Sequence, residues 1–341
     1  MNRRSINRLC VALALAASLV LPPAARAEGR TVRFQDYPGH GNLLIRVARS
    51  KGWCQAAGID CELRMIPAAP LGLQALIGGS IDVAQTPIEV VAAAVQRGAR
   101  LRTVVGSAVS NIFQIDVSSK LALPNQAQGY PAEMQDLKGL KVGVVARGSA
   151  TESFFSFLMQ QAGLKADDVT YVAVGAPNTA FAALRAGQVD AIVSWEPSGT
   201  MCELSRMCKA LFRGATATRP ALLKAMYGAG TGLVMRADEI ATHPEIARAV
   251  VKVSQQAAAF VNDPANEAEV LRISSDYFKF DMPQGDLIAR RTLEIGIESG
   301  TFKTMVRRSA VEATLEYLKD TRQLAALPTV ADLVWDQAPN E

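Results

Sequence analysis

The stretch RGSAT at residues 147–151 combines the residue types that hold an anion at the start of a helix. Gly148 lets the backbone approach a ligand closely, and Ser149 and Thr151 carry hydroxyls beside the free N–H groups of the helix predicted to follow. Arg147 would add a positive charge. The same hydroxyls also fit ordinary helix capping, and Arg147 fits a solvated surface position, so a cap alone stays an alternative. The predicted ligand contacts in this loop are Arg147, Gly148, Ser149, Ala150 and Thr151.

Two other loops offer polar side chains at the ends of predicted strands. Tyr37 and His40 lie in YPGHGN, where one side chain can form a flat wall for a ligand and the other can form a hydrogen bond. Gln85 and Thr86 follow the strand IDVA in the same way. Packing of Tyr37, a solvent-facing His40 and a helix start at Pro87 are the simpler alternatives. We expect all four side chains to contact the ligand.

The stretch SWEP contributes Trp195 and Glu196, and Tyr227 lies where the chain is expected to return between two lobes. Trp195 can stack on a ligand or fill the edge between the lobes, and Tyr227 fits a core position equally well. A carboxylate at Glu196 would repel an anion, so it would bind an amino group or form a salt bridge to the opposite lobe. The ligand class stays open between a simple oxyanion, a taurine-like zwitterion, an aromatic acid and a pyrimidine.

The four cysteines after residue 27 form two close pairs, Cys54 with Cys61 and Cys202 with Cys208. In an exported protein, close pairs predict disulfides that staple short loops. A metal site is the rival interpretation, but the two histidines, His40 and His243, stand far from any cysteine in sequence. We therefore predict two disulfides and no metal site.

The sequence shows no set of nucleophile, base and orienting residue, so we expect no catalytic residues and no cofactor. Residues 1–27 carry four arginines, an apolar run of 12 residues and a small-x-small end, which predicts a cleaved signal peptide. Removing its four arginines from the 36 basic residues leaves 32, equal to the 32 acidic ones. The excess of basic over acidic side chains therefore lies in the predicted signal peptide, and nucleic acid is not an expected partner.

The elements expected to position these residues occur twice in the chain. ALIGGSIDVA at 75–84 and ALRAGQVDAI at 183–192 share one phrase, with Asp82 and Asp190 at matching places. Around each phrase the apolar pattern predicts strand, helix, strand, helix, strand, which is typical of a parallel sheet with helices on its faces. We expect two such lobes, with the two aspartates in equivalent structural roles.

The predicted elements fall in similar order in both halves. The first half has strands at 31–37, 61–66, 81–84 and 101–106 and helices at 43–53, 71–78 and 87–97. The second has strands at 141–146, 168–174, 189–195 and 210–212 and helices at 153–163, 180–187 and 197–207. Strands at 112–118 and 231–236 leave and return to the first lobe, and helices at 243–261 and 311–322 should pack on and between the lobes.

Three stretches carry a resemblance to a known family: SKGWCQAAGIDCELRMIPAAPLGLQALIGGSIDVAQTP, LKGLKVGVVARGSATESFFSFLMQQAGL and AALRAGQVDAIVSWEP. They resemble the nitrate, sulfonate and taurine group of periplasmic solute-binding proteins. The resemblance implies an α/β fold of type II periplasmic binding protein, with two lobes, a two-stranded hinge and a ligand cleft between them. It implies that residues 28–110 and 226–341 form lobe 1 and residues 111–225 form lobe 2.

The same resemblance implies a monomer in the periplasm that captures a small, anionic solute and delivers it to the membrane permease of an ABC importer. Two alternatives share the fold. One is an enzyme or binding protein of the thiamine-pyrimidine type, whose cysteine-rich iron motif is not matched by Cys202 and Cys208. The other is a sensor module that uses the same cleft without transport.

Overall fold

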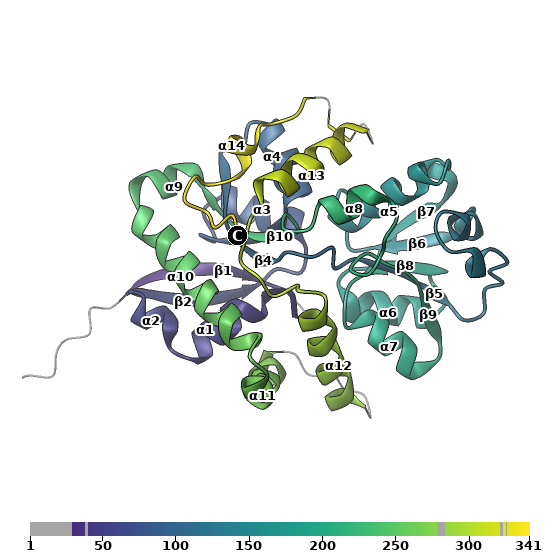
Figure 1. Cartoon of the computed structure of the whole chain (residues 1–341), viewed down its shortest axis with the longest axis horizontal. Helices are drawn as coiled ribbons and strands as arrows, with labels where there is room; N and C mark the ends of the chain where they lie inside the picture. Colours follow the sequence, from purple (N-terminus) through teal and green to yellow (C-terminus); the bar gives the residue numbers. More distant parts are fainter. Residues whose placement is uncertain (1–28, 38–39, 278–283, 321–322, 325) are drawn as a thin grey trace, which may run out of the picture.

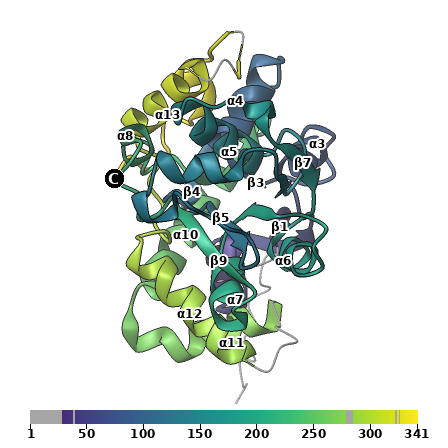
Figure 2. The same cartoon turned by 90° about the vertical axis from the view of Figure 1, so that its right-hand side faces the viewer.

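A computed structural model describes residues 29–37, 40–277, 284–320, 323–324 and 326–341. The predicted signal peptide lies outside these residues. Two α/β lobes lie side by side, each with a central sheet covered by helices (Figure 1). The second view shows helices on both sides of the sheets, with α12 and α11 grouped at one end of the molecule (Figure 2).

Lobe 1 contains strands from both ends of the chain. β1 and β2 pair in parallel, and β10 lies between β3 and β4 with antiparallel pairing on both sides. A single bridge from Phe34 to Val83 joins the two groups. The strands are β1 (Arg30–Asp36), β2 (Ile59–Met65), β3 (Ala84–Pro87), β4 (Leu101–Ala108) and β10 (Thr231–Arg236).

Lobe 2 has one five-stranded sheet in the order β7-β6-β8-β5-β9, with β5 antiparallel to both of its neighbours. The chain therefore crosses between lobes twice, between β4 and β5 and between β9 and β10. The strands are β5 (Gln114–Ser118), β6 (Lys141–Val144), β7 (Thr170–Ala173), β8 (Ala191–Ser194) and β9 (Cys208–Arg213). These crossings agree with the expected exit and return, while the lobe boundaries at 110/111 and 225/226 stay a prediction.

The helices predicted from the sequence lie near their expected ranges, and the structure adds α8, α9, α11, α12 and α14. Those before β10 are α1 (Leu43–Ser50), α2 (Trp53–Ala56), α3 (Ala69–Ile77), α4 (Ile88–Gln96), α5 (Ala150–Gln161), α6 (Pro177–Arg185), α7 (Ser198–Ser205) and α8 (Ala221–Ala225). Those after it are α9 (Ala237–Thr242), α10 (Pro244–Val261), α11 (Glu267–Tyr277), α12 (Gly285–Glu298), α13 (Arg308–Asp320) and α14 (Val330–Leu333). Short 3-10 helices span His40–Asn42, Gln126–Gln128, Ala132–Leu137, Ala166–Asp168 and Pro264–Asn266.

Two predicted elements of lobe 1 differ from the structure. The single helix expected at 43–53 is split, because Gly52 takes a left-handed conformation with φ of 72° between α1 and α2. The strand expected at 81–84 begins at Ala84 and runs to Pro87. Its partner is β10, which lies 144 or more residues later and cannot be identified from local sequence.

The repeated phrase forms the same joint in both lobes. Asp82 donates its N–H to the carbonyl of Arg33 on β1 (2.8 Å) and accepts the Arg33 N–H on its carboxylate (2.9 Å). Asp190 makes the same reciprocal pair with Lys141 on β6, at 2.9 and 2.8 Å. In both lobes the two residues are 49 positions apart. The predicted structural equivalence of the aspartates is confirmed.

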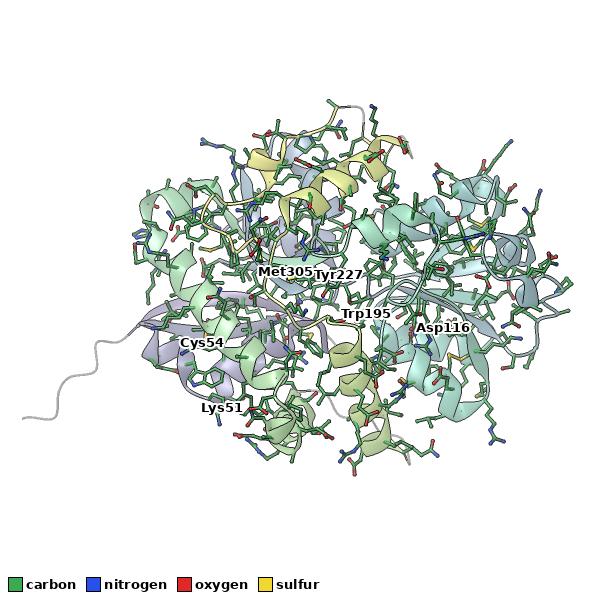
Figure 3. All side chains as sticks on the ribbon, in the orientation of Figure 1. Lys51, Cys54, Asp116, Trp195, Tyr227 and Met305 are labelled. Carbon is green, nitrogen blue, oxygen red and sulfur yellow. A yellow bond between two sulfur atoms is a disulfide. The ribbon has the colours of Figure 1, made fainter. Side chains whose placement is uncertain are left out.

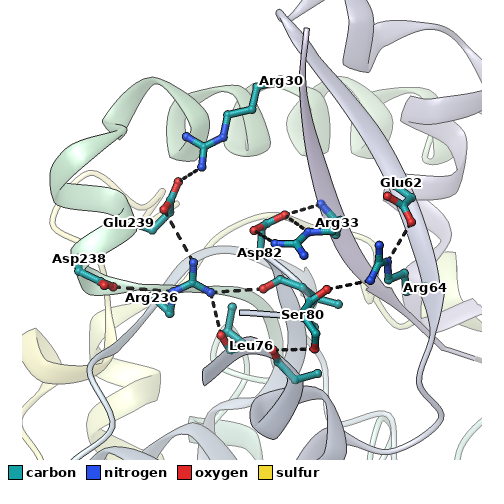
Figure 4. A network of polar contacts seen from close by, with 12 residues as sticks. Arg30, Arg33, Glu62, Arg64, Leu76, Ser80, Asp82, Arg236, Asp238 and Glu239 are labelled. Atoms are coloured by element: carbon teal, nitrogen blue, oxygen red, sulfur yellow. Dashed lines mark hydrogen bonds and ion pairs between the residues drawn. The ribbon is translucent and has the colours of Figure 1, made fainter. Parts of the chain in front are cut away.

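Asp82 carries an additional charge contact within a polar network on lobe 1 (Figure 4). The Arg33 guanidinium donates to both carboxylate oxygens, at 2.8 and 2.7 Å. Burial by itself would raise the pKa of Asp82, but the hydrogen bonds and charge of Arg33 outweigh it and hold that pKa below its ordinary value. Nearby, Arg236 ties the end of α3 to this joint by donating to the Leu76 carbonyl at 2.8 Å.

We expect Asp82→Asn to lower the free energy of unfolding by about 1–3 kcal/mol, because one oxygen that accepts from a charged donor is lost. Asp190→Asn should cost less, since its half-buried carboxylate accepts from the neutral Lys141 N–H, whereas that of Asp82 also accepts from a guanidinium. Urea titration and calorimetric ligand titration of both variants test this, with exposed Asp60→Asn as control. Lost binding at an unchanged midpoint, seen for both variants, would contradict the structural role.

The four cysteines form the two predicted disulfides. Cys54 on α2 bonds to Cys61 on β2, with Cα atoms 5.9 Å apart, and Cys202 on α7 bonds to Cys208 on β9, with Cα atoms 4.7 Å apart. The first disulfide closes the connection between α2 and β2 in lobe 1, and the second closes the connection between α7 and β9 in lobe 2. All four cysteines are buried.

The C-terminal helices contact both lobes. Ile288 on α12 is fully buried in a cluster of lobe 2 with Phe181, Met201 and the second disulfide. On the other side of the molecule, Tyr317 on α13 packs edge-on against Phe157 on α5, with ring centroids 4.7 Å apart. The expectation that the C-terminal helices pack on and between the lobes is confirmed, because they contact both lobes.

Candidate functional site

A small cavity of about 40 Å³ lies between the lobes, at the ends of their strands. We call it the inner chamber. Its lining residues are Tyr37, Gly41, Ala69, Gln85, Pro87, Ala108, Ile112, Phe113, Val145, Ser149, Ala150, Thr151, Trp195 and Thr231. None of these carries a charge, and most of the wall is apolar.

Three loops and strand β3, which ends in QTP, meet at this chamber. YPGHGN contributes Tyr37 and Gly41, PAAP contributes Ala69, and QTP contributes Gln85 and Pro87. The loop before α5 contributes residues 149–151 from the opposite lobe. These loops converge because each follows the carboxyl end of a strand, the edge at which ligands gather in open α/β sheets.

One buried amide joins three of these segments. Gln35 on β1 is fully buried, donates to the carbonyls of Ile66 (2.9 Å) and Ala68 (3.2 Å), and accepts the Gln85 N–H (3.1 Å). A Cβ on Gly72 would stand 1.9 Å from the Gln35 side-chain oxygen, so α3 can approach β1 this closely only with glycine there. Gln35 therefore sets the relative positions of the loops of lobe 1.

A buried ion pair holds the loop that carries Tyr37. Arg46 on α1 is fully buried and lies 2.9 Å from the carboxylate of Asp36, at the end of β1. That carboxylate also accepts from the Tyr37 N–H (2.9 Å) and from Asn42 Nδ2 (3.0 Å). Arg46 donates in addition to the Tyr37 carbonyl, and the Tyr277 ring covers its guanidinium at 5.3 Å. The buried pair of Arg46 and Asp36 thus fixes the loop that carries Tyr37 and forms one wall of the inner chamber.

Aromatic rings from both lobes form much of the chamber wall. Tyr37 meets Trp195 edge-on with ring centroids 6.2 Å apart, and Trp195 meets Phe113 at 6.3 Å. All three are at most 9% exposed. Figure 3 shows Trp195 where the two lobes meet. Burial raises the pKa of Tyr37, so its phenol keeps its proton and can donate to a ligand.

The start of α5 presents donors to the chamber. Ser149 is the N-cap residue but does not cap the first turn with its side chain, so the first N–H groups of α5 are left without that partner. Its hydroxyl lies 2.8 Å from that of Thr151, which accepts the Val145 N–H at 3.1 Å. The bond between the two oxygens uses one hydroxyl proton and leaves the second for a ligand acceptor.

Gln85 offers an acceptor on the opposite wall. Its Nε2 donates to the carbonyl of Gly41 and to the Ser107 hydroxyl at 3.2 Å, which fixes the orientation of the amide. Its Oε1 is buried and has no hydrogen-bond partner among the described residues. The inner chamber therefore has donors on the lobe 2 side and an acceptor on the lobe 1 side.

Arg147 and Gly148, two of the expected ligand contacts of the RGSAT loop, do not line the inner chamber. The Arg147 side chain is 65% exposed and forms a bidentate pair with Glu152, at 3.0 and 2.9 Å. Both residues line a separate crevice beside α3 and α4. Gly148 has φ of +73°, and the turn it makes directs Arg147 away from the cleft while Ser149 and Thr151 face it.

A larger cavity of about 340 Å³ continues from the inner chamber, and we call it the outer chamber. Its walls include Gln114, Glu196, Glu203 and Arg213 of lobe 2. From α12 and the following turn they include Arg291, Thr292, Ile295, Gly296, Glu298, Ser299, Thr301 and Phe302. The two chambers share Gly41, Ala108, Ile112, Phe113 and Trp195.

Glu196 lies in the outer chamber, not the inner one. Its carboxylate accepts from the Thr200 N–H (3.0 Å) and hydroxyl (2.8 Å) and pairs with Arg213 at 2.9 Å. Arg213 belongs to β9 of the same lobe, so the suggested salt bridge to the opposite lobe is wrong. Its partner is decided by the pairing of β9 with β5, which the sequence does not show.

Three predicted contacts stand elsewhere or are not described. Thr86 is fully buried in β3, opposite Gly232, and does not line either chamber. Tyr227 donates to the Gly300 carbonyl at 3.3 Å and lies under Arg307, also outside both chambers. His40 begins a 3-10 helix beside the inner chamber, but its side chain lies outside the described part of the structure.

Several lining residues were missed by the sequence reasoning. Ile112 and Phe113 directly precede β5, so their position at the predicted crossing between lobes was an available signal. Arg213 stands at the end of β9, another strand end. The residues of α12 had no such signal, because only tertiary packing brings this C-terminal helix to the cleft.

Within the described ranges, histidine, cysteine, aspartate and glutamate side chains form no group of three that could hold a metal ion. No helix among the same residues is long and apolar enough to cross a membrane.

Comparisons with known proteins agree with this architecture. A Brucella abortus protein named only as a binding protein is 26% identical over 286 residues, covering 82% of this chain and 80% of that one. A solved structure from Bordetella bronchiseptica RB50 matches with a TM-score of 0.72 and 23% identity, covering 90% of this chain and 95% of that one. The alkanesulfonate-binding protein SsuA from Xanthomonas axonopodis pv. citri, bound to MOPS, matches with a TM-score of 0.70 and 21% identity, covering 91% and 99%.

The profile of the NMT1-like family matches residues 39–275, which is more than half of the chain and spans both lobes. The expected fold is also confirmed, since the solved structures share it over nearly the whole chain. The chain belongs to the NMT1-like family and has the periplasmic binding protein fold.

Proposed function

We propose that this protein is the extracytoplasmic solute-binding component of an ABC importer, exported by its N-terminal signal and acting as a monomer that meets a membrane permease. The observation that carries the proposal is the inner chamber, where three loops and strand β3 bring together donors, an acceptor and aromatic walls from two lobes. The relatives named as binding proteins support the same role. A chamber of this kind is suited to capturing a small solute between the two lobes.

We propose further that the solute is a small organic molecule with an anionic group held at the start of α5. The free first-turn N–H groups and the available hydroxyl proton of Ser149 and Thr151 favour negative charge there. Because Arg147 is engaged by Glu152 outside the chamber, the preference would come from backbone and hydroxyl donors. Tyr37, Phe113 and Trp195 would cover the apolar part of the solute.

The double substitution Ser149→Ala with Thr151→Val tests this assignment. It removes the hydroxyl donor, worth about 1.5–3 kcal/mol toward a charged acceptor, so affinity should fall at least tenfold. Isothermal titration calorimetry should use a ligand first found by a thermal-shift screen of sulfonates, carboxylates and nitrate.

Ser156→Ala is the matched control, because it deletes a hydroxyl of the same helix that contacts Tyr171 at 2.8 Å and does not line the cleft. Its affinity should equal that of the wild type. If the double variant binds within twofold of the wild type, the α5 hydroxyls act only as a helix cap. The binding site would then be the aromatic wall.

A further inference from the structure

The outer chamber combines two charge clusters in which carboxylates outnumber guanidiniums. On lobe 2, Arg213 pairs with both Glu196 and Glu203. On α12, Arg291 pairs with Glu294 at 3.1 Å and with Glu298 at 3.7 Å. Each cluster therefore holds one guanidinium and two carboxylates. All of these residues except Glu294 line the same chamber, so its wall carries three carboxylates and two guanidiniums.

These clusters come from different parts of the chain and approach across the cavity. The lobe 2 side of the chamber has two carboxylates for one guanidinium and the α12 side has one of each, so bringing α12 beside lobe 2 leaves an excess of one negative charge around the chamber. Glu203 and Glu298 are the more exposed members, with 52% and 67% of their side chains accessible. Both can turn toward a cation in the chamber without leaving a buried charge behind.

A second and independent feature marks the same wall. Thr292 lies between the charged residues of α12, is 2% exposed, and lines the outer chamber. Its Oγ1 has no hydrogen-bond partner among the described residues. A buried hydroxyl without a partner costs free energy, and a ligand N–H would satisfy it.

We propose that the outer chamber binds a primary ammonium group, so that the solute is a zwitterion with its anionic end at α5 and its cationic end between Glu203, Glu298 and Thr292. This inference rests on the proposed function and names the class of solute within it. The inner chamber, at about 40 Å³, has room only for a compact group, while the outer chamber, at about 340 Å³, has room for a hydrated amine. The shared residues between them give one continuous path for such a molecule.

Calorimetric titration with matched probe pairs tests the inference. The amine-bearing probes are taurine, 3-aminopropanesulfonate, 4-aminobutyrate and 6-aminohexanoate, and the amine-free probes are ethanesulfonate, propanesulfonate, butyrate and hexanoate. In the wild type, the best amine-bearing probe should bind at least tenfold more tightly than its amine-free partner. In Glu203→Gln with Glu298→Gln that ratio should fall below about threefold, and Thr292→Val should lower it as well.

Glu62→Gln is the matched control, since Glu62 is a half-exposed carboxylate paired with Arg64 on β2, away from both chambers. It should leave the ratio unchanged. Amine-free probes that bind as well as or better than their partners would overturn the inference while leaving the proposed function in place. Failure of every probe of both kinds to bind would overturn the proposed function itself.

Discussion

Replacing Arg46 by methionine is expected to lower the free energy of unfolding by about 3–5 kcal/mol, the cost of leaving one partner of a buried ion pair uncompensated. Asp36 would remain buried and would still accept from the Tyr37 N–H and Asn42 Nδ2, which are neutral donors. Because Arg46 also donates to the Tyr37 carbonyl, the loop that forms one wall of the inner chamber should lose its anchor. Affinity for any ligand of the chamber should therefore fall together with stability.

Urea titration followed by circular dichroism measures the change in stability. Arg49→Met is the matched control on the same helix, because Arg49 is exposed and its side chain donates a long hydrogen bond of 3.3 Å to the Tyr277 hydroxyl. It should change the free energy by less than about 0.5 kcal/mol. The double variant Asp36→Asn with Arg46→Met should recover part of the loss, since no unpaired charge is left. A cost below about 1 kcal/mol for Arg46→Met would show that the pair does not hold the loop.

The second expected result concerns Asp116, which is fully buried on β5 in lobe 2 (Figure 3). Burial, with a smaller contribution from the charge of Glu196, raises its pKa to about 7 against the hydrogen bonds of Ser198 and Gln114 and the charge of Arg213. The folded state thus binds this proton more tightly than the unfolded state. The stability it contributes is complete below pH 4 and is lost as the pH rises through 7.

Asp116→Asn should remove that dependence. The neutral acid fits its surroundings, since it can donate to the Ser198 oxygen 2.8 Å away while Ser198 donates to the Trp195 carbonyl at 3.0 Å. An asparagine amide can donate in the same way. The variant should therefore match the wild type near pH 4 and exceed its stability at pH 8 by on the order of 4 kcal/mol, of which about 3 kcal/mol develops between pH 5 and pH 8.

Urea midpoints at pH 5, 6, 7 and 8 measure this difference. Glu89 and Glu133 also have pKa values raised to about 7 by burial, so the wild type and variant should share the slope that these two groups cause. The exposed Asp60→Asn serves as control and should follow the wild type at every pH. A difference between Asp116→Asn and the wild type that stays constant from pH 5 to pH 8 would contradict the assignment.

Local pattern was enough to predict much of the framework. The alternation in residues 31–37 and the repeated phrase around Asp82 and Asp190 predicted strands and a duplicated joint, and the structure has both. The close spacing of cysteines predicted both disulfides, because a separation of six or seven residues limits where the sulfur atoms can meet. The loops at strand ends were identified correctly, since that edge collects loops in any parallel α/β sheet.

The candidate site was predicted less completely, because loop membership does not give side-chain direction. Gly148 turns the backbone so that Arg147 faces Glu152 outside the cleft, and Ser149 and Thr151 face inward. Glu196 was placed in the right region, yet its partner Arg213 is set by pairing between strands. Tyr227 and Thr86 stand near the crossing and at a strand end, and both are used for packing within lobe 1.

The sequence by itself determined the duplicated α/β framework, the two disulfides and the loops that meet at the cleft, because each depends on residues close together in the chain. Only the tertiary structure decided that Arg46 supports the Tyr37 loop and that Asp116 is buried beside Glu196. It also decided that α12 brings Arg291, Thr292 and Glu298 to face lobe 2. Their physical effects depend on burial and on the approach of charges separated by tens of residues. No local periodicity encodes that approach, and the packing of the two lobes with the C-terminal helices creates it.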